Sequence, residues 1–387
     1  MSRELYFDNS LITKPSDEAV VAMMPYFTRN WGSPAAPHEW GNRLLPSIEE
    51  SLRSIYKMLG AGENDHFVFT SSGAEAVNHA LNAAYTDITL PTGRNQFLTS
   101  NVDEAPQIMA MNKLEKLGSV TTLINAGKGG LVTPEAVGDA LTPRSAIVSL
   151  SWACGLTGVI HPAQDIAEVC KERGVLLHLD ASHVLGKLYF EPEDVGADII
   201  TFEGSLLHAP QGTGGLWWKD GLSLSPFITG GTEQASKRAG PMNPAGLASL
   251  AKASEQLIDA RDLICMEGAR LRTQLEDKIK TGYPEAVVFC ADCERLPHMT
   301  AIGFPGISNE ALLFSLSRQN VFASIGGGNF QQIGLILEAG GVDKSLAHTA
   351  VSFSLSRETT DEDIEKAAEI IVDSAKKLRK TSTHMIP

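Results

Sequence analysis

The sequence has few of the features that mark secreted, membrane-spanning or nucleic-acid-binding chains. Its 387 residues include only five cysteines, an odd number that predicts no disulfide framework and favours a reducing compartment. No apolar run approaches the roughly 18–20 residues that span a bilayer. The start, MSRELYFDNS, lacks the basic and apolar regions of a secretory signal. The formal net charge of −14 argues against a nucleic-acid or anionic-membrane partner, and the sparse cysteines make the cytoplasm the expected location.

The composition is that of a folded globular protein, and strands alternate with helices through the first two-thirds of the chain. Hydrophobic residues make up 43% and charged residues 20% of the sequence. Short apolar runs predict strands at 66–70, 96–100, 146–153, 176–182, 199–204 and 214–218. Because these runs are continuously apolar, they favour a mostly parallel sheet that is covered on both faces. Helical spacing at 74–85 and 163–173 completes the pattern of an open α/β domain.

The pattern changes after about residue 260. A long helix is predicted at 246–280. A last helix at 361–380 begins with acidic and ends with basic residues, as the helix dipole favours. We therefore predict a large domain at 1–260, which includes an N-terminal arm, and a small α+β domain at 261–387.

The loops after the predicted strands carry a series of motifs in a recognisable order. Open α/β sheets bind ligands at the carboxyl ends of their strands, so a site is expected in these loops. The motifs are FDNS (7–10), GSPAAPHEWG (32–41), TSSGAEAVN (70–78), HLDASHVLGK (178–187), FEGSLLHAPQGTGGL (202–216), GGTEQASKRAGPMN (230–243), ASIGGGN (323–329) and SLAHTAVSFSLSR (345–357). In order and spacing the chain resembles the NifS/IscS-type cysteine desulfurases, within the class V aminotransferases, over essentially its whole length.

The resemblance implies a fold, a cofactor and an assembly. The fold is the α/β architecture of fold-type I transferases that depend on pyridoxal phosphate (PLP). It has a mostly parallel seven-stranded sheet in the large domain and a small C-terminal α+β domain. Family members hold PLP on the sheet, carry a nucleophilic cysteine on a mobile loop of the small domain, and form homodimers with active sites at the interface. The resemblance also suggests a sulfur-transfer or iron–sulfur assembly protein as a partner.

Two residues that cysteine desulfuration requires are replaced. The resemblance puts Leu206 at the position of the lysine that forms the Schiff base with PLP, and leucine can form no imine and move no proton. The nearest lysines, Lys187 and Lys219, flank other turns. Asn329 stands at the position of the sulfur-accepting cysteine, and an amide cannot take up a persulfide. We therefore expect neither a PLP Schiff base nor cysteine desulfuration.

The phosphate contacts implied by the resemblance also differ. Glu203 replaces a serine and Ser205 a histidine, and a carboxylate beside a phosphate is repulsive. Gly73, followed by alanine, stands where the family has an alanine–threonine pair. Pro241 replaces a threonine that reaches across from the partner subunit. The helix after residue 73 retains only the weak anion affinity of its backbone.

The contacts to the cofactor ring and the substrate are replaced in the same way. Ala105 stands in place of a stacking histidine, Cys154 in place of an asparagine, and His183 in place of a glutamine. Ser352 replaces the arginine that binds the substrate carboxylate. Only Asp180, the partner of the pyridinium nitrogen, is retained.

Three functional hypotheses remain open. The first is a pseudoenzyme that serves as a scaffold in sulfur or iron–sulfur metabolism, as a homodimer or a heterodimer. The second is a pocket around Asp180, Cys154 and His183 that now binds a metal or a small ligand. Four residues are of types that can bind a transition metal: Cys154, His183, His208 and Glu203. His178 and His208, each taken singly, also fit a hydrogen-bonded structural histidine. The third is a class V aminotransferase-like enzyme that holds PLP noncovalently.

Two further motifs fall outside these hypotheses. Cys290 and Cys293 form a C-x-x-C pair, which can indicate zinc or redox chemistry. A structural zinc usually needs a second such pair, which the sequence lacks, so two ordinary cysteines are the simpler interpretation. The GGG run at 326–328 is interpreted as a remnant of the family's mobile loop.

Overall fold

A seven-stranded sheet forms the centre of the computed structural model, which describes residues 3–383. Its strands are β2 (His66–Thr70), β3 (Gln96–Ser100), β4 (Val120–Ile124), β5 (Ser145–Ser151), β6 (Leu176–Asp180), β7 (Ile199–Glu203) and β8 (Gly214–Trp218). Their order is β2-β8-β7-β6-β5-β3-β4, and only β8 runs antiparallel to its neighbours. The predicted mostly parallel α/β sheet is confirmed.

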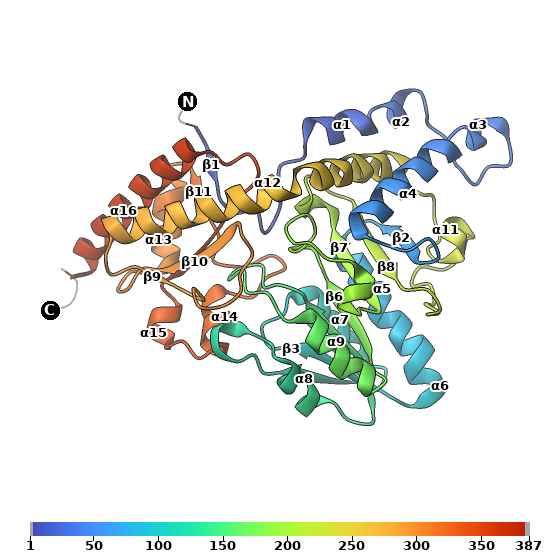
Figure 1. Ribbon diagram of the computed structural model, residues 1–387, viewed down its shortest axis with the longest axis horizontal. Helices are drawn as coiled ribbons and strands as arrows, with labels where there is room; N and C mark the ends of the chain where they lie inside the picture. Colours follow the sequence, from blue (N-terminus) through green and yellow to red (C-terminus); the bar gives the residue numbers. More distant parts are fainter. Residues whose placement is uncertain (1–2, 384–387) are drawn as a thin grey trace.

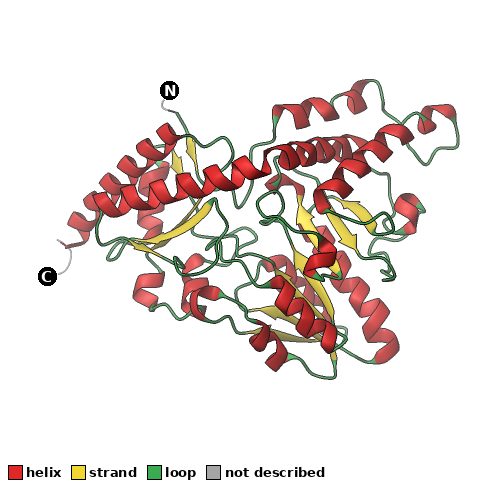
Figure 2. Ribbon diagram, viewed as in Figure 1, coloured by secondary structure: helices red, strands yellow, loops and turns green. Residues whose placement is uncertain are grey.

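Both faces of this sheet are covered, as the continuous apolarity of its strands predicts. Successive residues of β2, Val68 and Phe69, enter two different hydrophobic clusters, and so do Ile199 and Ile200 of β7. Side chains alternate between the faces of a strand, so each cluster lies on one face. Figure 2 shows helices on both sides of the yellow strands. The carboxyl ends of the strands are therefore the open positions for a site.

Both helices that were predicted between strands of the large sheet are present. Those helices, at 74–85 and 163–173, are α5 and α9. The helical elements are α1 (Asp17–Met23), α2 (Pro25–Thr28), α3 (Glu39–Asn42), α4 (Leu45–Leu59), α5 (Gly73–Ala84), the π-helix η1 (Tyr85–Thr89), α6 (Leu90–Thr92), α7 (Ala105–Glu115), the 3₁₀ turn η2 (Lys128–Gly130), α8 (Pro134–Ala140), α9 (Ala163–Glu172), α10 (Pro192–Val195), the 3₁₀ turn η3 (Gly204–Leu206) and α11 (Glu233–Ser236).

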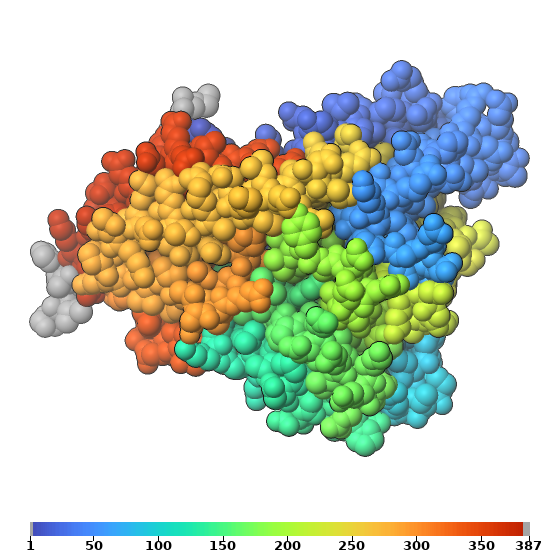
Figure 3. Space-filling view, viewed as in Figure 1, coloured from blue at the N-terminus to red at the C-terminus, as the bar shows by residue number. Residues whose placement is uncertain are grey.

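The helix α12 (Pro244–Gly282) joins the two parts of the molecule and confirms the long helix predicted at 246–280. Asn243 caps its start by accepting a hydrogen bond from the Gly246 N–H at 3.0 Å, and proline occupies the first helical position. Figure 1 shows it passing from the large sheet to the C-terminal part, yellow at its start and orange at its end, and Figure 3 shows the atoms of the same colours along this face. The helix is continuous across residue 260, so the division of the chain into domains there stays a proposal.

The C-terminal part has its own sheet and its own hydrophobic core. Its elements are β9 (Val287–Val288), β10 (Met299–Gly303), α13 (Asn309–Ser317), β11 (Val321–Phe322), α14 (Ile333–Ala339), α15 (Lys344–Ala347), β12 (Ala350–Ser354) and α16 (Asp361–Thr383). β10 pairs antiparallel with β12 and β9, and the last helix is confirmed as α16. The N-terminal strand β1 (Leu5–Tyr6) pairs with β11, so the N-terminal arm lies against this part. Among the described residues, no helix combines the length and apolarity needed to cross a membrane.

Candidate functional site

The carboxyl ends of β6 and β7 meet the amino end of α5 at a small cavity. Its volume is about 30 Å³, which leaves room for about two water molecules. The predicted residues that line it are Asp180, His183, Glu203, Leu206 and Asn329. The structure therefore brings together five residues from three separate loops of the sequence.

Asp180 ends β6 and is held by the turn that follows. Its Oδ1 accepts hydrogen bonds from the Ser182 N–H at 3.0 Å and the Ser182 hydroxyl at 2.5 Å. Burial, together with the nearby Glu104 carboxylate, raises the pKa of Asp180 to about 6, and the Ser182 hydrogen bonds oppose this rise. The turn thus supplies hydrogen bonds to the retained aspartate, although burial still disfavours its charged form.

Glu104 and Phe330 also line the cavity, although the sequence analysis did not select them. The Glu104 Oε1 and His183 Nε2 atoms lie 2.8 Å apart, so glutamate fixes the imidazole. The Phe330 ring lies 5.7 Å from the His183 ring, centroid to centroid. A Cβ atom at Gly155 would lie 2.5 Å from His183 Nε2 and 2.4 Å from the Phe330 ring, so this position requires glycine. In the sequence, only its position directly before Ala105 indicated that Glu104 could belong to the site.

Glu203 ends β7, and its carboxylate lies at the amino end of α5. Its Oε2 accepts a hydrogen bond from the Gly73 N–H at 2.8 Å, and its Oε1 accepts one from the Ser205 hydroxyl at 2.9 Å. A helix amino end favours a negative group because its first N–H groups lack partners within the helix. The chain therefore supplies its own anion at the place where the resemblance implies a phosphate.

Leu206 and the segment around Asn329 close the rest of the cavity. Leu206 is 5% exposed and forms part of the wall. The Asn329 carbonyl accepts a hydrogen bond from the Ala105 N–H at 2.8 Å. The Gln331 Nε2 donates to the carbonyls of Asn101 at 3.1 Å and Asp103 at 2.9 Å. These bonds dock the segment that follows the GGG run onto the large sheet.

Five other predicted site residues do not line this cavity, namely Ala105, Cys154, Ser205, His208 and Ser352. Cys154 is buried, and burial raises the pKa of its thiol. The Ser352 hydroxyl, on β12, donates to the Leu156 carbonyl at 2.7 Å. His208 bonds through Nδ1 to the Lys14 carbonyl at 2.9 Å. His178 bonds to the hydroxyls of Ser149 and Thr201. Both histidines are therefore hydrogen-bonded structural residues.

The structure does not support the predicted metal site. Within residues 3–383, no group of three or more His, Cys, Asp and Glu side chains is arranged to hold a metal ion. The four proposed ligands fail because His208 and Cys154 lie outside the cavity that His183 and Glu203 line. The thiols of Cys290 and Cys293 instead surround Gly129, where a Cβ atom would lie 3.5 and 2.9 Å from their sulfur atoms.

The two nearest lysines lie elsewhere as well. The Lys187 Nζ lies 3.4 Å from the Leu206 carbonyl oxygen, in a different cavity from Asp180. Lys219 follows β8 and forms an ion pair with Asp198. Asp198 directly precedes β7, so this pair lies at the end of the strand away from the cavity. Among the described residues, no lysine lines the cavity at Asp180.

Comparison with known proteins defines the class. The family model described as aminotransferase class V matches residues 5–367, and the chain belongs to this family. It is similar to the cysteine desulfurase of Trichormus azollae, with 32% identity over 383 residues, 98% of this chain and 94% of that protein. A cysteine desulfurase of Gluconacetobacter diazotrophicus is 33% identical over 388 residues, 98% and 95% of the two chains.

Solved structures confirm the fold. A structure titled NifS-like protein superposes with a TM-score of 0.90 at 23% identity, over 97% of this chain and all of that one. The apo structure of a cysteine desulfurase from Thermococcus onnurineus NA1 gives a TM-score of 0.85 at 17% identity, over 97% and 95% of the two chains. The predicted resemblance is thereby confirmed.

The family depends on PLP, and the residues of this cavity do not fit that cofactor. The Glu203 carboxylate already bonds the amino end of α5, so a phosphate there would meet a like charge. The remaining volume of about 30 Å³ is far below that of a typical small-molecule site, roughly 300 Å³ or more. What the described groups offer is the Asp180 carboxyl, whose pKa burial raises, near the hydrogen-bonded pair of Glu104 and His183.

Proposed function

We propose that this chain is a catalytically inactive relative of the cysteine desulfurases and acts by binding another protein. The observation that carries the proposal is Leu206, which stands where the resemblance places the Schiff-base lysine and lines the cavity beside Asp180. Leucine offers no amine for covalent catalysis. The named relatives are cysteine desulfurases. The proposed partner is therefore a sulfur-transfer or iron–sulfur assembly protein in the cytoplasm, and the proposed assembly is a homodimer.

The docked segment around Asn329 supports the same proposal. The resemblance implies a mobile loop here that carries a reactive cysteine. In this chain the segment carries an amide and is tied to the large sheet by the hydrogen bonds of Asn329 and Gln331. A loop without a thiol and with a fixed backbone is suited to a permanent surface rather than to sulfur delivery. The alternative of a small ligand at the cavity stays a prediction.

The primary test is incubation with PLP, followed by absorbance spectroscopy, borohydride reduction and peptide mapping. We expect no Schiff-base band, no reduced adduct and no sulfide release from cysteine. The double variant Leu206→Lys with Glu203→Ser supplies an amine and removes the competing carboxylate. It should gain a reducible PLP adduct at residue 206, whereas Leu206→Lys alone should gain much less. A reducible adduct in the unchanged protein, at Lys187 or any other lysine, would refute the proposal.

The binding role needs its own test. The chain should co-purify with a genuine cysteine desulfurase or an iron–sulfur scaffold protein when these are produced together, and sedimentation should report a dimer. The unchanged protein and the Leu206→Lys, Glu203→Ser double variant should bind the partner equally well, because the proposed role does not use the cavity. Absence of binding to both partner classes would contradict this part of the proposal while leaving the catalytic part intact.

A further inference from the structure

A second cavity lies on the other side of Leu206. Its volume is about 20 Å³, which leaves room for one particle of about the size of a water molecule. Four basic side chains line it, from separate parts of the chain: Lys187, His208, His298 and Arg357. Among the described residues, no aspartate or glutamate lines it. A buried cavity with this charge composition lacks the counter-charge that buried cations need.

Lys187 is the clearest sign of this missing counter-charge. The residue is 9% exposed, and its Nζ has one hydrogen-bond partner, the Leu206 carbonyl at 3.4 Å. That distance is longer than most N–H···O hydrogen bonds. Within residues 3–383, no carboxylate forms an ion pair with it. Burial lowers the pKa of Lys187 to about 8, so the ammonium form still predominates at neutral pH.

His298 contributes a polar atom with no partner. The residue is 5% exposed, and its Nδ1 forms no hydrogen bond to any described residue. Gly268 of α12 allows the histidine to pack against the helix, because a Cβ atom there would lie 3.3 Å from the His298 Cβ. A buried polar atom without a partner is costly, so such atoms usually indicate an ordered water or ion.

Of the other two basic groups, Arg357 adds positive charge and His208 is neutral near pH 7. Burial and the charges of Arg357 and Lys187 lower the pKa of His208 to about 4, whereas its hydrogen bond to the Lys14 carbonyl opposes the change. The Arg357 guanidinium has a weak contact with the Gln256 side chain at 3.4 Å. Lys187 and Arg357 thus carry like charges at one small cavity. A bridging water could bond to His298, but it could not offset this repulsion.

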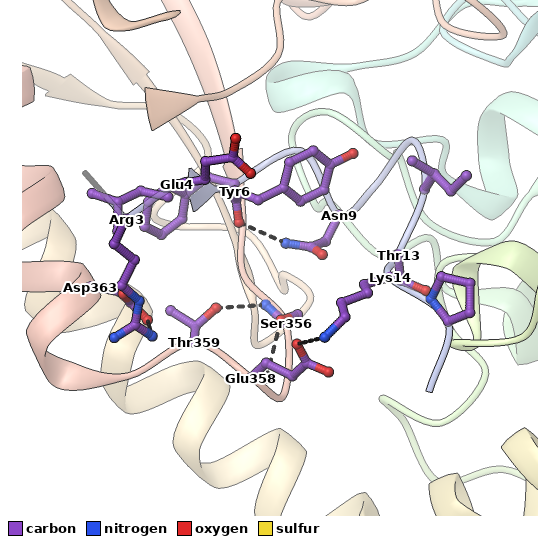
Figure 4. A pocket seen from close by; sticks show the side chains of 14 residues that line it. Arg3, Glu4, Tyr6, Asn9, Thr13, Lys14, Ser356, Glu358, Thr359 and Asp363 are labelled. Carbon is purple, nitrogen blue, oxygen red and sulfur yellow. Dashed lines mark hydrogen bonds and ion pairs between the residues drawn. The ribbon is translucent and has the colours of Figure 1, made fainter. Parts of the chain in front are cut away.

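A surface groove lies next to the cavity. The groove has a volume of about 600 Å³ and lies between the N-terminal arm and residues 356–363. Figure 4 shows Lys14 reaching Glu358 across it, with a separation of 3.6 Å. Asn9, Thr13 and Ser356 line both the groove and the basic cavity. The basic cavity is therefore separated from the groove by three polar side chains.

We propose that the basic cavity binds one small monovalent anion, with chloride as its cellular ligand. The anion would accept hydrogen bonds from the Lys187 ammonium and the His298 Nδ1–H, and it would offset the charge of Arg357. Chloride is little larger than water and fits a cavity for one such particle, whereas phosphate and larger carboxylates do not. The site is separate from the cavity at Asp180 and does not depend on the proposed function.

The test uses bromide as the probe on the full-length protein. Crystals grown or soaked in potassium bromide should show an anomalous peak beside the Lys187 Nζ and the His298 Nδ1. In solution, potassium bromide should raise the melting temperature above that in potassium gluconate of equal ionic strength. A crystal with anomalous peaks only on the surface would overturn the proposal.

Matched variants separate the site from general salt effects. Lys187→Met should abolish the difference between bromide and gluconate, and Lys219→Met, at a lysine paired with Asp198, should retain it. His298→Phe removes the proposed second donor and should weaken bromide binding at least tenfold, which serves as the test if Lys187→Met does not fold. An equal bromide effect in the unchanged protein and in His298→Phe would also overturn the proposal.

Discussion

The two cavities that share Leu206 as a wall differ in charge and in how their polar groups are satisfied. At the strand ends, the carboxylates of Asp180, Glu203 and Glu104 all bond to groups of the chain. On the other side, Lys187 and His298 are buried without adequate partners. The chain has replaced a ligand with its own side chains in the first cavity, and it leaves a ligand to be supplied in the second.

The largest effect should come from Lys187, through pH. Its pKa in the folded state, about 8, lies below its ordinary value of 10.5, so the unfolded state binds more protons between these values. Stability should therefore rise from pH 8 to pH 10.5, by up to about 3 kcal/mol in halide-free buffer. Lys187→Met should lack this rise, and Lys219→Met should keep it. Denaturant unfolding measures the free energy of unfolding across this pH range. If it changes with pH in the same way in the unchanged protein and in Lys187→Met, the proposed difference between the two cavities is wrong.

The next effect should come from Glu203. Glu203→Ala removes the carboxylate that bonds the Gly73 N–H and the Ser205 hydroxyl, and it should lower the free energy of unfolding by about 2 kcal/mol. Inorganic phosphate should restore part of this loss, because the freed helix end can bind an anion. Glu172→Gln, at an exposed glutamate of α9, should show neither effect. Chemical denaturation with and without phosphate is the measurement.

Asp180 should give an effect of opposite sign to that of Lys187. Its pKa is raised from 3.8 to about 6, so the folded state favours the protonated acid. The stability this supplies is complete below pH 3.8 and is lost as the pH rises through about 6, which should amount to at most about 3 kcal/mol. Asp180→Asn should flatten this decline, whereas Asp139→Asn, at an exposed position, should not. If stability does not fall in this range relative to Asp180→Asn, the first cavity is not a self-satisfied acidic site.

The smallest effect should come from the C-x-x-C pair, which belongs to neither cavity. Cys293→Ser should change the free energy of unfolding by less than about 0.5 kcal/mol, because the side chain is only partly buried and forms no metal site with described residues. A metal chelator should leave the melting temperature of the protein unchanged. A clear loss of stability with chelator would contradict this prediction and restore a metal hypothesis.

The sequence predicted the central fold well because the buried strands are continuously apolar. The predicted bounds of β2, β3 and β8 agree with the structure residue for residue. β4 was missed because it is an edge strand, partly exposed, with two threonines that break the apolar run. The pairing of β1 with β11 joins residues from opposite ends of the chain, and no local pattern encodes such a contact.

The site was predicted in part for a related reason. Asp180, His183 and Glu203 follow neighbouring strands, so the topology alone brings them together. The roles of Glu104 and Phe330 depend on side-chain packing between distant loops, which periodicity does not show. Lys187 was the hardest to interpret, because a lysine in a Gly-Lys turn resembles a surface residue in sequence and only packing reveals its burial.

The continuous helix α12 has a mechanical consequence for the basic cavity. Its 39 residues form a rod about 58 Å long, and its proline is the first residue, where it introduces no kink. A rotation of the two parts about residue 260 would have to break backbone hydrogen bonds within this rod. We therefore expect α12 to serve as a fixed frame for the basic cavity, with the buried Asn9 and Thr13 of the N-terminal arm hydrogen-bonded beside it.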